Sequence, residues 1–190
     1  YAGYLDWRVR DENGTDGVKV DSADTPSAGD TAFDSVTENT ASGGVCKYDN
    51  DHAAHGTQSL KIATVASSVS SYVQWDTTGF GTTQYFRAYL YFTANPSGNI
   101  DVIQIRDGST RARLRINSTG KVVAVNGGTT VGTSTASISL NQWVRVEYRW
   151  IANTTTGSLE AKLFNTPDST TADETLTVTS LGKLGGIVTT

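Results

Sequence analysis

Tyrosine, arginine and glutamine side chains recur at alternate positions of several segments in the middle of the chain. The residues concerned are Tyr85, Arg87, Tyr89, Tyr91, Gln104, Arg106, Arg113, Arg115, Arg145 and Glu147. Tyrosine rings can stack on the faces of sugars, and arginine forms paired hydrogen bonds with carboxylate and sulfate groups. We interpret this set as a candidate saccharide-binding face, suited to an anionic glycan. The alternative is a solvated sheet face in which arginine pairs with glutamate and tyrosine on neighbouring strands.

The segments that must position these side chains alternate as β-strands do. Apolar residues occupy every second position of 85–92, 102–106, 111–116 and 143–150, between the polar residues. A period of two with one apolar face is typical of a strand that lies on a hydrophobic core. Turn-forming residues separate these segments, and no window has the apolar spacing of a helix.

Other segments complete the predicted fold. Further strands are expected at 17–20, 58–65, 70–76, 121–125, 130–138, 158–164 and 175–179. Roughly ten or more short strands with turns between them predict an all-β protein, an antiparallel jelly-roll β-sandwich. The polar segments 21–50 and 165–174 are expected to be loops, with Phe33 and Val36 as anchors of the first.

The length of 190 residues suits one domain with a substantial core. We expect residues 13–190 to form this domain and residues 1–12 to be an N-terminal arm or linker. The chain contains no methionine and stops after a glycine-rich segment that resembles the approach to another strand. We therefore expect a processed chain or a fragment, with the sandwich truncated at its C-terminal end.

The overall charge limits the classes of partner. A net charge of −4 argues against a nucleic-acid partner. No apolar run approaches the roughly 18 residues that span a bilayer, so no membrane partner is expected. The sequence shows no signal peptide.

Residues that could bind metal or attack a substrate form no clear motif. We expect no cofactor, with Ca²⁺ as the open alternative. The carboxylates that could supply oxygen ligands to Ca²⁺ are Asp11, Asp16, Asp21, Asp24, Asp30 and Asp34. His52 and His55 could ligate a metal, but a turn before a strand is the preferred interpretation. Cys46, the single cysteine, excludes an intramolecular disulfide and is interpreted as a small apolar residue, with catalysis beside a histidine as the alternative.

Six segments, taken in order, resemble the concanavalin A-like, laminin-G-like jelly-roll superfamily. More narrowly, they resemble modules of actinobacterial secreted proteins and structural proteins of phages that infect such bacteria. The segments are Asn13–Val18, Ala32–Val36, His55–Lys61, Tyr85–Phe92, Asn141–Glu147 and Gly157–Phe164. The resemblance extends over residues 13–188.

The resemblance implies a non-catalytic carbohydrate-binding or adhesion module of a larger extracellular or phage surface protein. Its partner would be a polysaccharide or cell-surface glycan, or neighbouring subunits of a virion or surface protein. The alternative is a structural virion domain, such as a decoration, fibre or tail domain, without a ligand. Either role implies an extracellular location or the virion surface.

The superfamily also includes glucanases and polysaccharide lyases, so an enzyme is the remaining alternative. A retaining glucanase needs two carboxylates about 5–5.5 Å apart, but Glu147 is the only acid of its strand and has arginines on either side. A lyase would need a base such as Tyr89 or Tyr91 beside Gln104 and Arg106. The strand histidine expected of such lyases is absent, and we expect no enzyme activity.

Overall fold

Short strands joined by turns account for most of the chain. Its computed structural model describes residues 2–10, 16–17, 35–55, 59–63, 70–74, 82–107, 109–153 and 155–181. In chain order the elements are β1 (Ala2–Arg10), β2 (Asp16–Gly17), β3 (Ser35–Thr37), the 3-10 helix η1 (Thr40–Ser42), β4 (Val45–Asp49), β5 (Ser59–Ala63), β6 (Tyr72–Gln74), β7 (Thr83–Phe92), β8 (Ile100–Asp107), β9 (Ser109–Ile116), β10 (Lys121–Asn126), β11 (Thr129–Ser137), β12 (Trp143–Ile151), β13 (Gly157–Phe164) and β14 (Glu174–Leu181).

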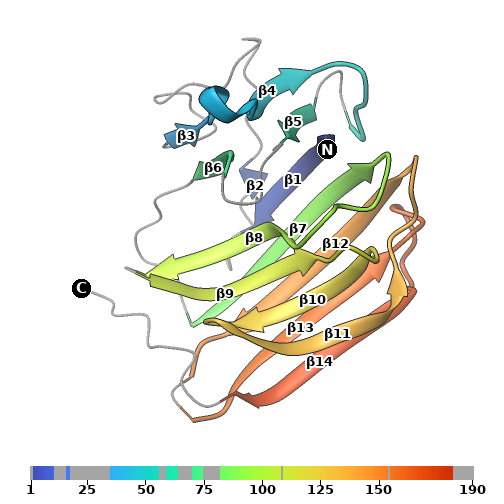
Figure 1. Cartoon of the computed structure of the whole chain (residues 1–190). Helices are drawn as coiled ribbons and strands as arrows, with labels where there is room; N and C mark the ends of the chain where they lie inside the picture. The colour runs from blue at the N-terminus through green and yellow to red at the C-terminus, as the bar shows by residue number, and fades with distance from the viewer. Residues whose placement is uncertain are drawn as a thin grey trace.

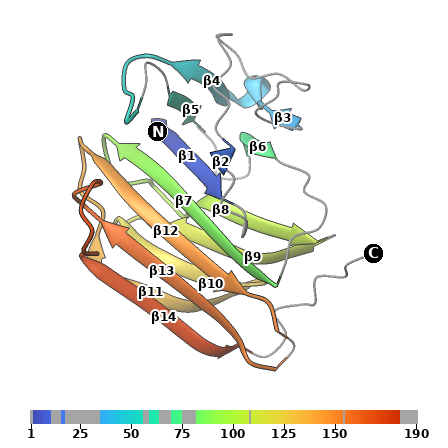
Figure 2. The ribbon, with the colours of Figure 1, turned by 180° about the vertical axis from the view of Figure 1, so that it is seen from behind.

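Two antiparallel sheets lie face to face. The large sheet has the order β14-β13-β12-β7-β1-β5-β4, with β2 paired to β1, and the four-stranded sheet has the order β11-β10-β9-β8. The four-stranded sheet lies in front in Figure 1, and the large sheet lies in front in Figure 2. The described part of the chain is an all-β sandwich, which confirms the predicted fold class at this level.

The alternation of apolar residues explains which face of each strand is buried. β7 and β12 pair so that Ala88 lies opposite Val146 and Leu90 lies opposite Val144, and all four side chains are buried. On the facing sheet, the predicted apolar positions of β9 are fully buried. Burying one large apolar side chain contributes about 1.5–3 kcal/mol, so a shift of one residue in register would be strongly unfavourable.

One core joins the two sheets. Its largest fully buried side chains come from both layers, namely Leu90, Leu114, Ile116, Val122, Val144, Val146, Tyr148, Trp150, Leu159 and Leu163. The sequence therefore predicted the inward faces of β7, β9 and β12 correctly. With those faces buried, the polar residues between them lie on the outside of the sandwich.

The carboxylate of Glu174 joins the adjacent edges of the two sheets. It accepts hydrogen bonds from the backbone N–H groups of Thr135, at 2.8 Å, and Ala136, at 2.6 Å. Leu176 and Val178 of β14 lie so close to Gly132 of β11 that a Cβ on the glycine would be about 3.0–3.2 Å from their methyl groups. This edge of the sandwich is therefore closed by both hydrogen bonds and apolar packing.

A second, smaller core lies at the other end of the large sheet. Cys46 and Tyr48 of β4 and Leu60 of β5 form it, and Val36 and Val73 pack against them. Val36 and Val73 are paired residues of β3 and β6, which make a two-stranded sheet. Figure 1 shows these elements beside the N-terminal part of the large sheet.

The structure differs from the sequence prediction in the N-terminal third. Residues 1–12 were predicted as an arm or linker, but Ala2–Arg10 forms β1, which lies between β5 and β7 in the large sheet. Part of the predicted loop 21–50 forms β3, η1 and β4. Phe33 and the predicted strand residues 18–20 lie outside the described residues.

Candidate functional site

The structure divides the predicted face between the two sheets. The residues of β7 and β12, from Tyr85 to Tyr91 and from Arg145 to Glu147, belong to the large sheet. Gln104 and Arg106 of β8, with Arg113 and Arg115 of β9, belong to the four-stranded sheet. Because the core lies between these sheets, the two groups face opposite sides of the molecule. Alternation along a strand could not reveal this division, since it does not specify which strands are neighbours.

Strand pairing in the large sheet produces a row of alternating charges. Glu147 is paired with Arg87 on one side and with Lys162 on the other, and Lys162 is paired with Thr175 of β14. All four residues alternate with inward-facing ones, so they occupy the outer face of the large sheet. Opposite charges at directly paired positions stabilise a sheet by about 0.2–1 kcal/mol each.

Glu147 is the centre of this row. Its Oε1 lies 2.8 Å from Nη2 of Arg87 and accepts a hydrogen bond of 2.9 Å from Nε of the same residue. Nε of Arg145 lies 3.2 Å from the same oxygen. Two cations thus hold one carboxylate oxygen.

Arg145 connects the outer face to the segment between β13 and β14. It donates hydrogen bonds to the backbone carbonyls of Pro167 and Ser169, the second at 2.7 Å. Its guanidinium also lies 3.7 Å from the centre of the Phe164 ring. The sequence predicts an accessible arginine here, but the side chain is buried because residues 165–173 fold over it. Arg145 is therefore a support for the site and not an accessible ligand-binding group.

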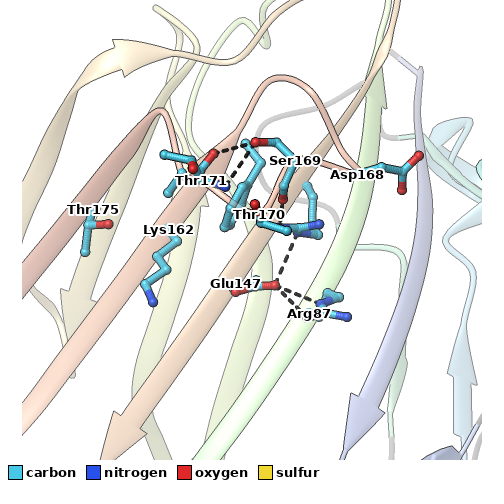
Figure 3. A pocket seen from close by; sticks show the side chains of 11 residues that line it. Arg87, Glu147, Lys162, Asp168, Ser169, Thr170, Thr171 and Thr175 are labelled. Carbon is cyan, nitrogen blue, oxygen red and sulfur yellow. Dashed lines mark hydrogen bonds and ion pairs between the residues drawn. The ribbon is translucent and has the colours of Figure 1, made fainter.

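A cleft of about 640 Å³ opens between this segment and the row of charges. Its floor includes Arg87, Glu147 and Lys162, and its wall is formed by residues 168–172, with hydroxyl groups from serine and threonine. Figure 3 shows Glu147 between Lys162 and Arg87, below Ser169–Thr171. The volume is in the range of small-molecule sites, about 300–1,000 Å³. Its lining of hydroxyls, ammonium, guanidinium and carboxylate suits a strongly hydrogen-bonding ligand.

Tyr85 provides an exposed aromatic ring beside the cleft. It lies two residues before Arg87 on the same face of β7, and 47% of its surface is exposed. The guanidinium of Arg149, its partner on β12, lies 5.8 Å from the centre of the ring. A fixed and accessible ring of this kind can serve as a stacking platform.

The other two tyrosines of β7 are covered. The sequence predicts that Tyr89 is accessible, but only 6% of it is exposed, and His55 contacts its ring edge-on at 4.6 Å between centres. His52 stacks on Tyr91 at 4.0 Å, and Trp143 contacts Tyr91 from the side. The segment after β4 therefore lies over this end of the outer face, a contact between distant residues that local periodicity does not encode.

The predicted residues of the four-stranded sheet form a separate cluster around Asp101. Its two carboxylate oxygens contact Nε of Arg115 and Nε of Arg113, the latter at 3.6 Å. Gln104 is paired with Arg113 and is exposed, as is Arg106. Asp101 was not among the predicted site residues, although the sequence places it directly before the alternating segment 102–106.

Cys46 has no features of a nucleophile. The side chain is completely buried in the small core, and burial, followed by the negative charge of Glu38, raises the pKa of its thiol to about 12. A protonated and inaccessible thiol is chemically inert. This agrees with its interpretation as a small apolar residue.

Within the described ranges, no group of three or more His, Cys, Asp or Glu side chains is arranged to hold a metal ion. The aspartates considered for Ca²⁺ have no described side-chain positions. No helix among the described residues is long and apolar enough to cross a membrane.

Some residues of the cleft were not predicted from the sequence. Lys162 of β13 lies in the same row as Arg87 and Glu147, and its ammonium lies 3.3 Å from Glu160. Its outward position follows from alternation within 158–164, so it could have been found. The wall residues 168–172 had only the polar composition of a turn, which gives no indication of the surface that they cover.

Comparisons of the chain with protein-family models, with curated proteins and with solved structures found no match.

Proposed function

We propose that this protein is a jelly-roll, concanavalin A-like and laminin-G-like module that binds carbohydrate without catalysis. In this proposal it mediates adhesion for a larger extracellular or phage surface protein, and the cleft on the large sheet is its saccharide site. The observation that carries the proposal is the position of the exposed Tyr85 ring beside an open cleft lined with hydroxyl and charged groups. An aromatic platform with adjacent polar groups matches the two surfaces of a sugar, its apolar face and its hydroxyls.

The arrangement of acids supports binding over catalysis. Glu147 interacts through one oxygen with both Arg87 and Arg145, so this carboxylate already serves as the ion-pair partner of two arginines. The residues that a lyase would combine lie apart, because Tyr89 and Tyr91 are on the large sheet and Gln104 is on the other.

The test is a glycan array that contains neutral, uronic-acid and sulfated polysaccharides, probed with and without Ca²⁺. Specific binding is expected, and Tyr85→Ala should weaken it about tenfold, equivalent to about 1.4 kcal/mol. Tyr85→Phe should retain most of the affinity, because it keeps the ring. Thr177→Ala, on an exposed position of β14, is the matched control and should have no effect.

Two results would contradict the proposal. If the folded domain binds no glycan in any condition, a structural virion domain without a ligand becomes the better explanation. If Tyr85→Ala binds as strongly as the unmodified protein, the saccharide site does not lie at this cleft.

A further inference from the structure

We propose that the outer face of the four-stranded sheet is a second binding face, for a polysaccharide that carries carboxylate or sulfate groups. This face lies on the opposite side of the sandwich from the cleft. The inference is independent of the proposed function of the cleft, because none of the residues that carry it belongs to the cleft.

Charge is the first observation. Arg106, Arg113 and Arg115 lie on two adjacent strands, and Asp101 is the acid that pairs with two of them. Among the described side chains of this cluster, three guanidinium groups against one carboxylate leave a local excess of positive charge. The chain as a whole has a net charge of −4, so this positive cluster is opposite in sign to the net charge of the chain.

The orientation of the arginines is the second observation. Asp101 contacts both Arg113 and Arg115 through their Nε atoms. Within the described part of the chain, no other hydrogen bond or ion pair holds these two guanidiniums. Asp101 therefore holds two side chains on one face of β9, and these stay partly exposed, 23% for Arg113 and 19% for Arg115, so that a ligand can reach them. Guanidinium groups match the geometry of carboxylate and sulfate oxygens.

The surface beneath the arginines is apolar. Val123 and Val125 of β10 are paired with Arg115 and Arg113, and both valines are buried although they alternate with core residues. Arginine stems cover adjacent apolar surface while their charged ends remain in water. The pairing places each arginine beside a buried valine, and a stem that lies along such a residue is restrained, so less entropy is lost when a ligand binds.

The chemistry of the face favours a polysaccharide over a nucleic acid. Single-stranded nucleic acids bind where aromatic side chains stack on the bases. Among the described residues, the exposed aromatic side chains are Tyr72 and Tyr85, and neither belongs to the four-stranded sheet. Gln104, exposed opposite Arg113, adds an amide that can bond with sugar hydroxyls.

The test measures the affinity of the full chain for dextran sulfate and for polygalacturonate, with neutral dextran as the blank. Arg106→Gln combined with Arg113→Gln should weaken binding to the charged polymers at least tenfold. Asp101→Asn should strengthen it several-fold, because the amide oxygen can still accept from the arginine Nε groups while the negative charge of Asp101 is lost. Lys47→Gln, which removes a positive charge from an exposed position of β4 in the large sheet, outside the cleft, should alter the affinity less than twofold. Thermal unfolding of each variant identifies any that fail to fold.

The gain expected from Asp101→Asn separates a binding face from a merely structural cluster, since losing a structural ion pair would not increase affinity. Binding to either charged polymer supports the proposal and identifies the preferred anion. Absence of binding to both, or unchanged affinity in Asp101→Asn, would overturn it. Equal competition by single-stranded DNA, added at the same concentration of negative charge, would also overturn it. If Arg87→Gln loses binding while the Arg106→Gln, Arg113→Gln variant keeps it, the polyanion binds at the cleft. That result would contradict this inference and leave the proposed function intact.

Discussion

The guanidinium of Arg145 lies 3.7 Å from the centre of the Phe164 ring, on the outer face of the large sheet. The same side chain holds the carbonyl groups of Pro167 and Ser169. One arginine thus joins the floor of the cleft to its wall. A buried cation in this position replaces the apolar residue that would usually anchor such a segment.

We predict that Arg145→Ala lowers the free energy of unfolding by about 2–4 kcal/mol, because it removes charged hydrogen bonds and the cover of Phe164. Arg145→Lys should recover only part of this loss, since an ammonium cannot reproduce the planar contacts. Urea denaturation measures both. An Arg145→Ala variant as stable as the original protein would show that residues 165–173 are held by other contacts.

Acid should weaken the closed edge of the sandwich at Glu174. Partial burial would raise the pKa of this carboxyl, but the N–H groups of Ala136 and Thr135, the Thr135 hydroxyl and Lys121 outweigh it and lower the pKa below its ordinary value of 4.5. A carboxyl with a lowered pKa stabilises the fold fully above its unfolded value, and this contribution is lost as the pH falls further.

Glu174→Gln should therefore cost about 1 kcal/mol at pH 7 and much less at pH 3. Thermal unfolding of both proteins from pH 7 to pH 3 measures the difference. Glu160→Gln is the control, because Glu160 pairs with Lys162 at the surface. If the difference in stability between the original protein and Glu174→Gln does not change with pH, the ionised carboxylate does not contribute to stability.

The Cys46 thiol should be unreactive in the folded protein. Its burial and a pKa of about 12 keep it protonated and inaccessible at pH 8. An aromatic disulfide reagent should give no absorbance change until denaturant is added, and then one equivalent of product. Rapid labelling without denaturant would mean that the small core opens easily.

Core substitutions should reveal how much the main core contributes. Leu114 is fully buried between the sheets, so Leu114→Ala should destabilise the protein by about 2–5 kcal/mol. Thr177→Ala, on an exposed position, should change stability by less than about 0.5 kcal/mol. Chemical denaturation of both variants provides the comparison. Similar effects would indicate that Leu114 is not enclosed by the core.

The sequence predicted the strands of residues 83–181 well because each carries its own alternation. The failures were β1, β3 and β4. Leu5, Trp7 and Val9 alternate in β1, but their position at the start of the chain favoured a prediction of an arm. Cys46 and Tyr48 are alternating apolar residues of β4, but two such residues within a long polar segment are too few to predict a strand.

The candidate site was less predictable than the fold. Periodicity correctly identified Tyr85, Arg87 and Glu147 as outward-facing, since these positions alternate with buried ones. It could not show that Gln104 lies on the opposite sheet or that His55 covers Tyr89. Both facts depend on contacts between segments distant in sequence, which local patterns do not contain.

The place of β1 in the large sheet has a consequence for folding during synthesis. β1 leaves the ribosome before β5 and β7, which are its neighbours in the sheet, and Gly3 pairs with Phe92. At about 5–20 residues per second, β1 waits several seconds for β7. Among the side chains that the structure describes, those of the main core come from β7 onward. β1 therefore lacks one of its neighbours until β7 has been made, and until then it presents an unpaired strand edge to chaperones.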